Sequence, residues 1–112
     1  MYLRIGNFIY KIYIARTMNQ KLKGLIGKEN INYGLLIPKC NQIHTFFMKE
    51  NIDVIAIDQF NKVLYKYEDV SPNKIIRIFN KQKNTSILEL PKNASKMIKI
   101  NDILFFENKY II

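Results

Sequence analysis

The stretch IDVIAID at residues 52–58 decides the fold of this chain of 112 residues. Its nearly continuous apolar character is typical of a strand that lies at the centre of a sheet and is covered on both faces. A turn over residues 59–62 follows, and Val63, Tyr65 and Tyr67 then alternate along the next segment. This alternation predicts a return strand, and therefore an antiparallel hairpin at the centre of the fold.

The N-terminal segment predicts a second hairpin and then a helix. Leu3 and Ile5 precede the pair Gly6-Asn7, which favours a two-residue turn, and apolar side chains alternate over residues 8–14. Residues 17–20, Thr-Met-Asn-Gln, fit the capping box that begins a helix. The helix is expected to run for about ten residues. A helix of this length is too short to be stable without tertiary packing.

One face of this helix is expected to pack on the core. Met18, Leu22 and then Leu25 or Ile26 lie about one helical turn apart, so we expect them to face inward. Gly27 is the expected C-terminal cap.

The rest of the chain predicts more short strands and little helix. Strand-like segments occupy residues 33–37, 43–48, 87–90 and 103–106; residues 75–79 fit either a helix or a strand, 80–84 a polar, mobile loop and 93–97 one helical turn. The expected fold class is therefore α+β. We expect a single compact domain over residues 1–112, mainly antiparallel β, with one or two short helices and with a partly closed barrel as one form it could take.

Composition limits the classes of function. The chain carries 18 basic and 9 acidic residues, and its formal net charge of +9 raises the hypothesis of a nucleic-acid or other polyanion partner. The basic residues are 15 Lys and only 3 Arg, spread along the chain, whereas Arg is the residue that forks onto phosphates and bases. Nucleic acid is therefore not the partner that the sequence favours, since a solvated basic surface explains the charge more simply.

Location and cofactors are constrained by what the sequence lacks. A single Cys excludes an internal disulfide, the N-terminus has no uninterrupted apolar segment of a signal peptide, and no run approaches the roughly 18 to 20 apolar residues of a membrane span. We expect a cytoplasmic protein without membrane contact. The sequence carries no phosphate-binding glycine loop, Cys-x-x-Cys pair or nucleophile elbow, so no cofactor or metal is expected. The sequence does not determine the oligomeric state.

The segment from residue 40 to residue 58 is the candidate site, because it holds the single Cys and the single His. Cys40 and His44 could form a nucleophilic pair if the chain folds back between them, since an extended strand would separate them by about 13 Å. With Asp53 or Glu50 they could hold a metal, although the spacing matches no standard site. Alternatively, Cys40 is a small buried hydrophobe and His44 a hydrogen-bonded strand residue.

Asp53 is the more informative residue of this segment. Alternation places it on the same face as Ile55 and Ile57, and a buried carboxylate there must be paired with His44, with Lys49 or with backbone N–H groups. A pair with the histidine could transfer protons or orient a ligand. A carboxylate that only holds a turn is the equal alternative.

Several segments together resemble the domain of unknown function 192 family, over about residues 14–105. Residues 17–28 are similar to its helix motif Thr-x-x-x-Arg-x-x-Gly-Leu-Met-x-Arg, with Lys for Arg and Ile for Met. Residues 40–48 with 52–54 resemble the Cys-x-x-Ile-His-Thr branch, and residues 33–37 and 87–91 resemble its Gly-Met-Leu-Phe and Leu-Glu-Leu segments. The resemblance implies a compact α+β domain among mostly small bacterial and archaeal proteins, and it implies no activity. The motif positions are Thr17, Gly24, His44, Met48 and Asp53.

Three functions are compatible with these observations. The first is a non-catalytic binding or accessory domain that holds a small polar or anionic ligand, or a protein segment; its ligand-binding residues would be Thr17, Lys21, His44, Lys49 and Asp53. The second is a hydrolase or transferase that uses His44 and Asp53 for acid–base chemistry, assisted by Cys40 or a metal. The third is polyanion binding through a Lys-rich surface.

Overall fold

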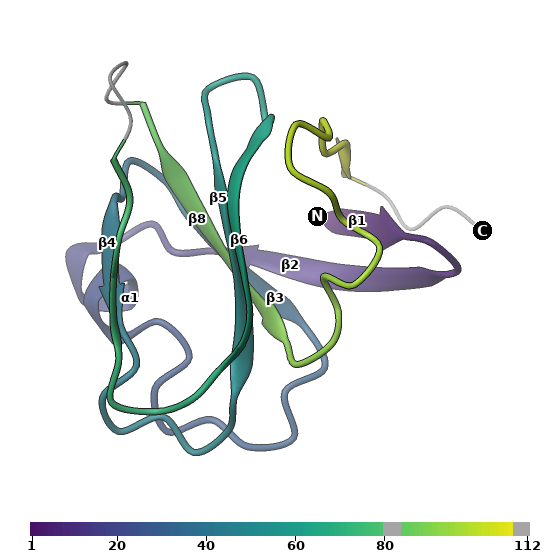
Figure 1. Ribbon diagram of the computed structural model, residues 1–112. Coiled ribbons are helices and arrows are strands. Elements are labelled where there is room, and N and C mark those ends of the chain that lie inside the picture. Colours follow the sequence, from purple (N-terminus) through teal and green to yellow (C-terminus); the bar gives the residue numbers. More distant parts are fainter. Residues whose placement is uncertain (80–83, 109–112) are drawn as a thin grey trace.

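The structure, a computed structural model, describes residues 1–79 and 84–108 (Figure 1). Its elements, in chain order, are β1 (Tyr2–Ile5), β2 (Phe8–Ile14), α1 (Met18–Lys23), β3 (Gly34–Ile37), β4 (Gln42–His44), β5 (Ile52–Ile57), β6 (Val63–Val70), β7 (Ile75–Arg77), β8 (Ser86–Pro91) and β9 (Phe106–Glu107). Within the described residues the fold is mainly β with a single short helix. This corrects the expectation of an α+β domain.

Seven strands form one twisted sheet in the order β6-β5-β8-β3-β2-β1-β9, and β4 pairs with β7 in a separate two-stranded sheet. The strand pairs are antiparallel except for β2 and β3, which run parallel. The strand order ends at β6 and at β9, so over the described residues the sheet does not close into a barrel. In Figure 1, α1 and β4 lie together on one side, and the segment after β8 passes beside β1 on the other.

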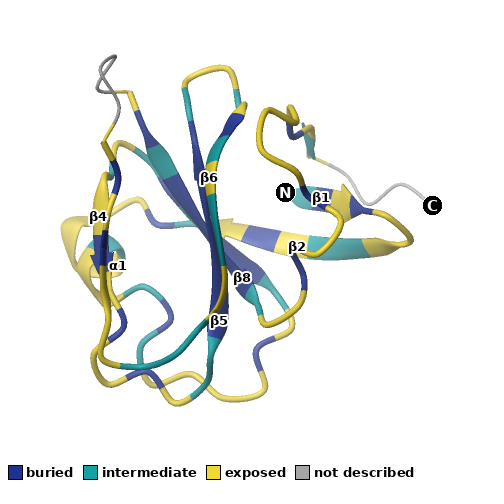
Figure 2. Cartoon of the chain, viewed as in Figure 1, coloured by how far each residue is buried: buried dark blue, intermediate teal, exposed yellow. Residues whose placement is uncertain are grey.

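β5 lies between β6 and β8, and all six of its residues are buried (Figure 2). This confirms the predicted central strand, because each face of β5 is covered by its own apolar cluster. We call these clusters the helix-side core, which includes Leu25, Ile43 and Ile76, and the hairpin-side core, which includes Leu3 and Ile12. Val54 and Ala56 belong to the former and Ile55 and Ile57 to the latter, as the alternation of strand side chains requires.

The capping box that was predicted at the start of α1 is confirmed. The backbone N–H of Gln20 donates to Oγ1 of Thr17 at 3.1 Å, and Oε1 of Gln20 accepts from the backbone N–H of Thr17 at 3.1 Å. The helix then ends after six residues at Gly24, not at Gly27 as predicted.

No helix in the part of the chain that the structure describes has the length and apolar character needed to cross a membrane.

The predicted apolar face of α1 is wrong for its first two residues. Met18 and Leu22 are 70% and 66% exposed, whereas Leu25 is 2% exposed. The physical reason is the early end of the helix, because Gly24 turns the chain before Leu25, and only the residues after this turn reach the helix-side core.

The strand that was predicted over residues 43–48 ends at His44. The hydroxyl of Thr45 donates to the carbonyl oxygen of Ser71 and accepts from the backbone N–H of Lys74, both at 2.8 Å. Phe47 has a φ of 64°, which a strand residue does not adopt. Side-chain and backbone hydrogen bonds between Thr45 and the connector at 71–74 therefore take the place of a continued strand in this segment.

The structure confirms most of the other predicted elements and differs from the prediction at two of them. The hairpin β1–β2 and the strands β3, β5, β6 and β8 are confirmed, and residues 75–79, left open between helix and strand, contribute the strand β7. Residues 93–97 form turns and no helix, and most of 103–106 precedes the short strand β9. The loop predicted at 80–84 lies outside the described residues except for Asn84.

Candidate functional site

Asp53 is a fully buried carboxylate, and its hydrogen bonds connect parts of the fold. Its Oδ1 accepts from the backbone N–H of Asp69 at 2.9 Å. Its Oδ2 accepts from the backbone N–H of Ser95 at 2.9 Å and from the hydroxyl of Ser95 at 2.5 Å. The carboxylate thereby ties the end of β6 and the turn after β8 to the centre of the sheet, which is the turn-holding arrangement that the sequence left open.

His44 lies at the surface, at the end of β4 opposite Ile75 of β7. Its ring stacks on Phe46, with 5.1 Å between the ring centroids. Over the residues described, no hydrogen bond or ion pair joins His44 to Asp53 or to Cys40. The structure therefore does not bring together the acid and the imidazole that acid–base chemistry would require.

Cys40 is half-buried against the helix-side core. Its Sγ donates to the carbonyl oxygen of Gln42 at 3.2 Å, and its backbone N–H donates to the carbonyl oxygen of Thr85 at 2.8 Å. Burial raises the pKa of the thiol, so the reactive thiolate is depleted at neutral pH. This environment fits a small packed side chain better than a nucleophile.

The remaining predicted residues also lie apart. Thr17 uses its hydroxyl in the helix cap, and Nζ of Lys49 lies 3.4 Å from a carboxylate oxygen of Glu29, with both side chains largely exposed. The charge of Lys21 lowers the pKa of the Cys40 thiol, which indicates that the two side chains lie near each other. Among the described residues no group of three or more His, Cys, Asp and Glu could hold a metal ion.

Glu89 is the residue that the sequence reasoning missed as a site candidate. It lies in β8 and is 4% exposed, yet no hydrogen bond or ion pair from the described residues reaches its carboxyl group. Burial raises the pKa of this group to about 7. The signal was a single acid within the apolar segment 87–90, which is the argument that singled out Asp53 in β5.

The carboxyl group of Glu89 lies against the C-terminal cap of α1. A Cβ atom placed on Gly24 would be 2.5 Å from Oε1 of Glu89. Gly24 has a φ of 53° and a ψ of −131°, a conformation that is open to glycine. The absence of a side chain at residue 24 thus gives the carboxyl group its space.

The same glycine lines a cavity of about 270 Å³, which we call the basic pocket. Its walls come from the end of β2, from α1 with its cap and from β3, and Ala15 and Leu35 are buried wall residues. The charged residues that line it are Lys23 and Lys28, and no acidic residue is among its lining residues in the described part of the chain.

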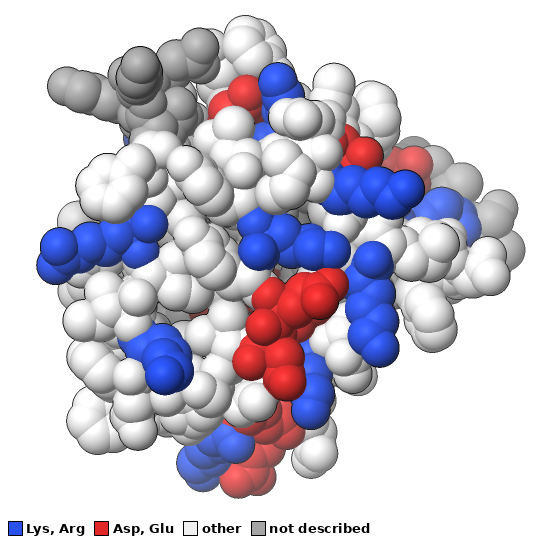
Figure 3. Space-filling view, viewed as in Figure 1, with Lys and Arg blue, Asp and Glu red and all other residues white. Residues whose placement is uncertain are grey.

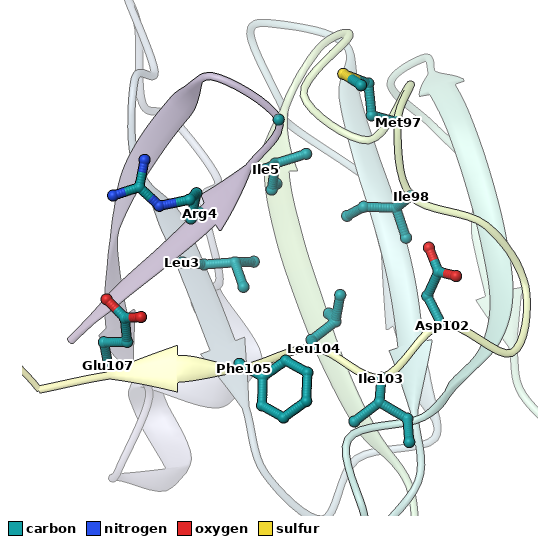
Figure 4. Close-up of a pocket in the computed structure, with 11 residues that line it drawn as sticks. Leu3, Arg4, Ile5, Met97, Ile98, Asp102, Ile103, Leu104, Phe105 and Glu107 are labelled. Atoms are coloured by element: carbon teal, nitrogen blue, oxygen red, sulfur yellow. The ribbon is translucent and has the colours of Figure 1, made fainter. Parts of the chain in front are cut away.

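A larger cavity, of about 480 Å³, opens between β1 and the segment 97–107 (Figure 4). Leu3 and Leu104 are buried side chains of its wall. Figure 4 shows Arg4 and Glu107 on one side of the cavity and Asp102 on the other. This cavity combines both signs of charge, whereas the charge that lines the basic pocket is positive only.

The comparisons with known proteins agree with the fold. None of the curated proteins compared with the chain matches it. A crystal structure of a protein of unknown function from Novosphingobium aromaticivorans is similar, with a TM-score of 0.73 and 16% identity over 88% of this chain and 76% of that one. A protein from Sinorhizobium meliloti, described as a "putative transcription regulator", has a TM-score of 0.72 and 16% identity over 93% of this chain and 89% of its own. At this identity the likeness concerns the fold alone.

The family model gives the more specific result. It is that of DUF192, described as an uncharacterized ACR, and it matches residues 2–105. This range includes every strand except β9, together with α1, Glu89 and both motif segments around His44 and Asp53. The chain therefore belongs to the domain of unknown function 192 family.

Proposed function

We propose that this protein is a non-catalytic binding domain that holds a small anionic ligand in the basic pocket. The observation that carries the proposal is the lining of that pocket, in which Lys23 and Lys28 supply positive charge and which includes no acidic residue from the described part of the chain. Buried apolar wall residues beside two ammonium groups suit a ligand with a carboxylate and a short apolar body. Two of its lining residues, Gln20 and Lys23, belong to the helix that the sequence indicated.

What supports binding over catalysis is the separation of the reactive groups. The carboxylate of Asp53 is engaged by Asp69 and Ser95, His44 lies outside at the surface, and the thiol of Cys40 is held protonated by burial. A general base needs to reach the proton it removes, and a nucleophile needs its base within hydrogen-bond distance. We propose a cytoplasmic location, in keeping with a single half-buried cysteine.

Polyanion binding is the less favoured function. On the face shown in Figure 3 the Lys and Arg side chains are interspersed with acidic ones, and they form no continuous basic stripe there. Lys66 is moreover engaged within the fold, because its Nζ lies 3.0 Å from an oxygen of Glu68 and donates to two carbonyl oxygens of the turn after β8. A polyanion-binding surface requires affinity that falls steeply with salt, so a salt titration with a nucleic-acid duplex distinguishes this function from anion binding in one pocket.

Benzoate tests the proposed function, with its neutral isostere benzamide as the control ligand. We expect NMR shift changes at residues around the basic pocket on titration with benzoate and none with benzamide. The double variant Lys23→Gln with Lys28→Gln should weaken benzoate binding about tenfold, because both pocket charges are removed. The matched control is Lys62→Gln with Lys96→Gln, two exposed lysines outside the pocket. Equal responses to benzoate and benzamide, or equal losses in both double variants, would contradict the proposal.

A further inference from the structure

Glu89 and the basic pocket share a wall. Gly24 lines the pocket, and a Cβ atom added to this glycine would be 2.5 Å from Oε1 and 3.3 Å from Oε2 of Glu89. Leu35, also a lining residue, is the cross-strand neighbour of Glu89 in β3. A ligand in the pocket would therefore lie against the same glycine as this carboxyl group.

The carboxyl group of Glu89 has no hydrogen-bond or ion-pair partner among the described residues that would stabilise its ionised form. No hydrogen bond or ion pair from the described residues reaches it, although the residue is 4% exposed. On the α1 side Lys21 is the nearby cation, and in the connector before β4 Cys40 is the nearby titratable group, since both Glu89 and Lys21 shift the pKa of that thiol. Lys23 and Lys28 lie on the pocket side, and the neighbours in β3 and β5 are Leu35 and Val54.

We propose that Glu89 couples ligand binding in the basic pocket to uptake of a proton, because its neutral form accepts an anion beyond Gly24 and its ionised form repels one. The proposal rests on the proposed function, since it requires that the pocket binds an anion. Like charges that lie close together in a poorly solvated part of a protein repel strongly. Burial raises the pKa of Glu89 to about 7, so this coupling falls within the physiological pH range.

The test is the affinity for benzoate between pH 5.5 and pH 8.5, a range in which benzoate itself stays ionised. For the unmodified protein we expect the affinity to fall about tenfold as pH rises through 7. Glu89→Gln removes the charge at nearly constant size, and its affinity should be independent of pH. Cys40→Ser serves as the control, because removing the nearby thiol should leave the pH dependence unchanged.

A second measurement needs no variant. Calorimetric titration of the unmodified protein with benzoate at pH 7, in two buffers of different ionisation enthalpy, should show uptake of a fraction of one proton per benzoate. Parallel pH profiles for the unmodified protein and Glu89→Gln, or binding without proton uptake, would overturn the inference while leaving anion binding intact. Failure of benzoate to bind at any pH would overturn the proposed function, and the proton coupling with it.

Discussion

Asp53 and Glu89 are two buried carboxyl groups on neighbouring strands, and the fold treats them in opposite ways. In the register of β5 and β8, Asp53 faces Leu90 and Val54 faces Glu89, so the two acids are one step apart and point to opposite sides of the sheet. Asp53 receives hydrogen bonds from Asp69 and Ser95. Glu89 receives none from the described residues and lies against the cap of α1.

This difference teaches where a buried charge is structural and where it is available for function. A carboxylate that is satisfied by backbone N–H groups stabilises the fold and has no capacity left for a ligand. A carboxyl group buried without donors is neutralised more easily, and its protonation state can respond to what lies beside it. The side of the sheet that carries Glu89 is therefore the side on which we place the binding site.

Asp53→Asn should have the largest effect on stability. The amide offers one acceptor oxygen, and its NH2 group would face donors that now bind the carboxylate, so we expect a loss of about 4 kcal/mol in the free energy of unfolding. Urea unfolding at pH 7 measures it. Glu68→Gln, which breaks the partly exposed ion pair with Lys66, should cost less than about 1 kcal/mol. Similar losses in the two variants would show that Asp53 is no more structural than a surface acid.

Glu89→Gln should abolish a pH dependence of stability. The pKa of Glu89 rises from its ordinary value of 4.5 to about 7 in the folded protein, so the folded state holds more protons than the unfolded state between these values. Stability from this group is therefore greatest at low pH and declines, by about 3 kcal/mol in all, as pH rises from 4.5 through 7. Urea unfolding between pH 5 and pH 8 should show this decline in the unmodified protein relative to Glu89→Gln. A constant difference between the two across this range would contradict the assignment.

Gly24→Ala should destabilise the protein more than Gly27→Ala. Both glycines have positive φ, 53° and 78°, but a Cβ atom at residue 24 meets the carboxyl group of Glu89, whereas nothing lies within 4 Å of one at residue 27. We expect losses of about 2 and about 1 kcal/mol in the free energy of unfolding, respectively. Combining Gly24→Ala with Glu89→Ala should recover the excess, since the shorter side chain leaves room for the methyl group. An excess that persists in the double variant would mean that backbone conformation alone sets the cost.

Ser95→Ala tests the third hydrogen bond to Asp53, and its effect on stability should be the smallest of the four. It removes the hydroxyl donor to Asp53 and leaves both backbone donors in place, so unfolding should become easier by about 1.5 kcal/mol. Ser86→Ala is the matched control, because the hydroxyl of Ser86 makes no hydrogen bond with the described residues. This variant should leave the free energy of unfolding nearly unchanged. Thermal unfolding of the two variants, measured side by side, decides whether the third bond matters.

Sequence patterns predicted the parts of the fold that depend on neighbours along the chain. The apolar run at 52–58, the turn pair Gly6-Asn7 and the capping box at Thr17 are local signals, and all three correspond to the observed elements. The predictions failed where distant contacts decide, as for Thr45, whose bonds to the 71–74 connector end β4 early. The same holds for Met18 and Leu22, whose helical spacing carries no information about where the sheet lies.

The sequence by itself determined the family, the central strand and the need for a partner at Asp53, because motif order, apolar runs and the cost of a buried charge can all be read along the chain. Only the tertiary structure decided that Ser95, 42 residues away, meets that need, and that His44 does not. It also placed Glu89 behind Gly24, two residues that lie 65 positions apart. The physical reason is that hydrogen bonding and desolvation depend on distances in space, which the order of strands in the sheet sets.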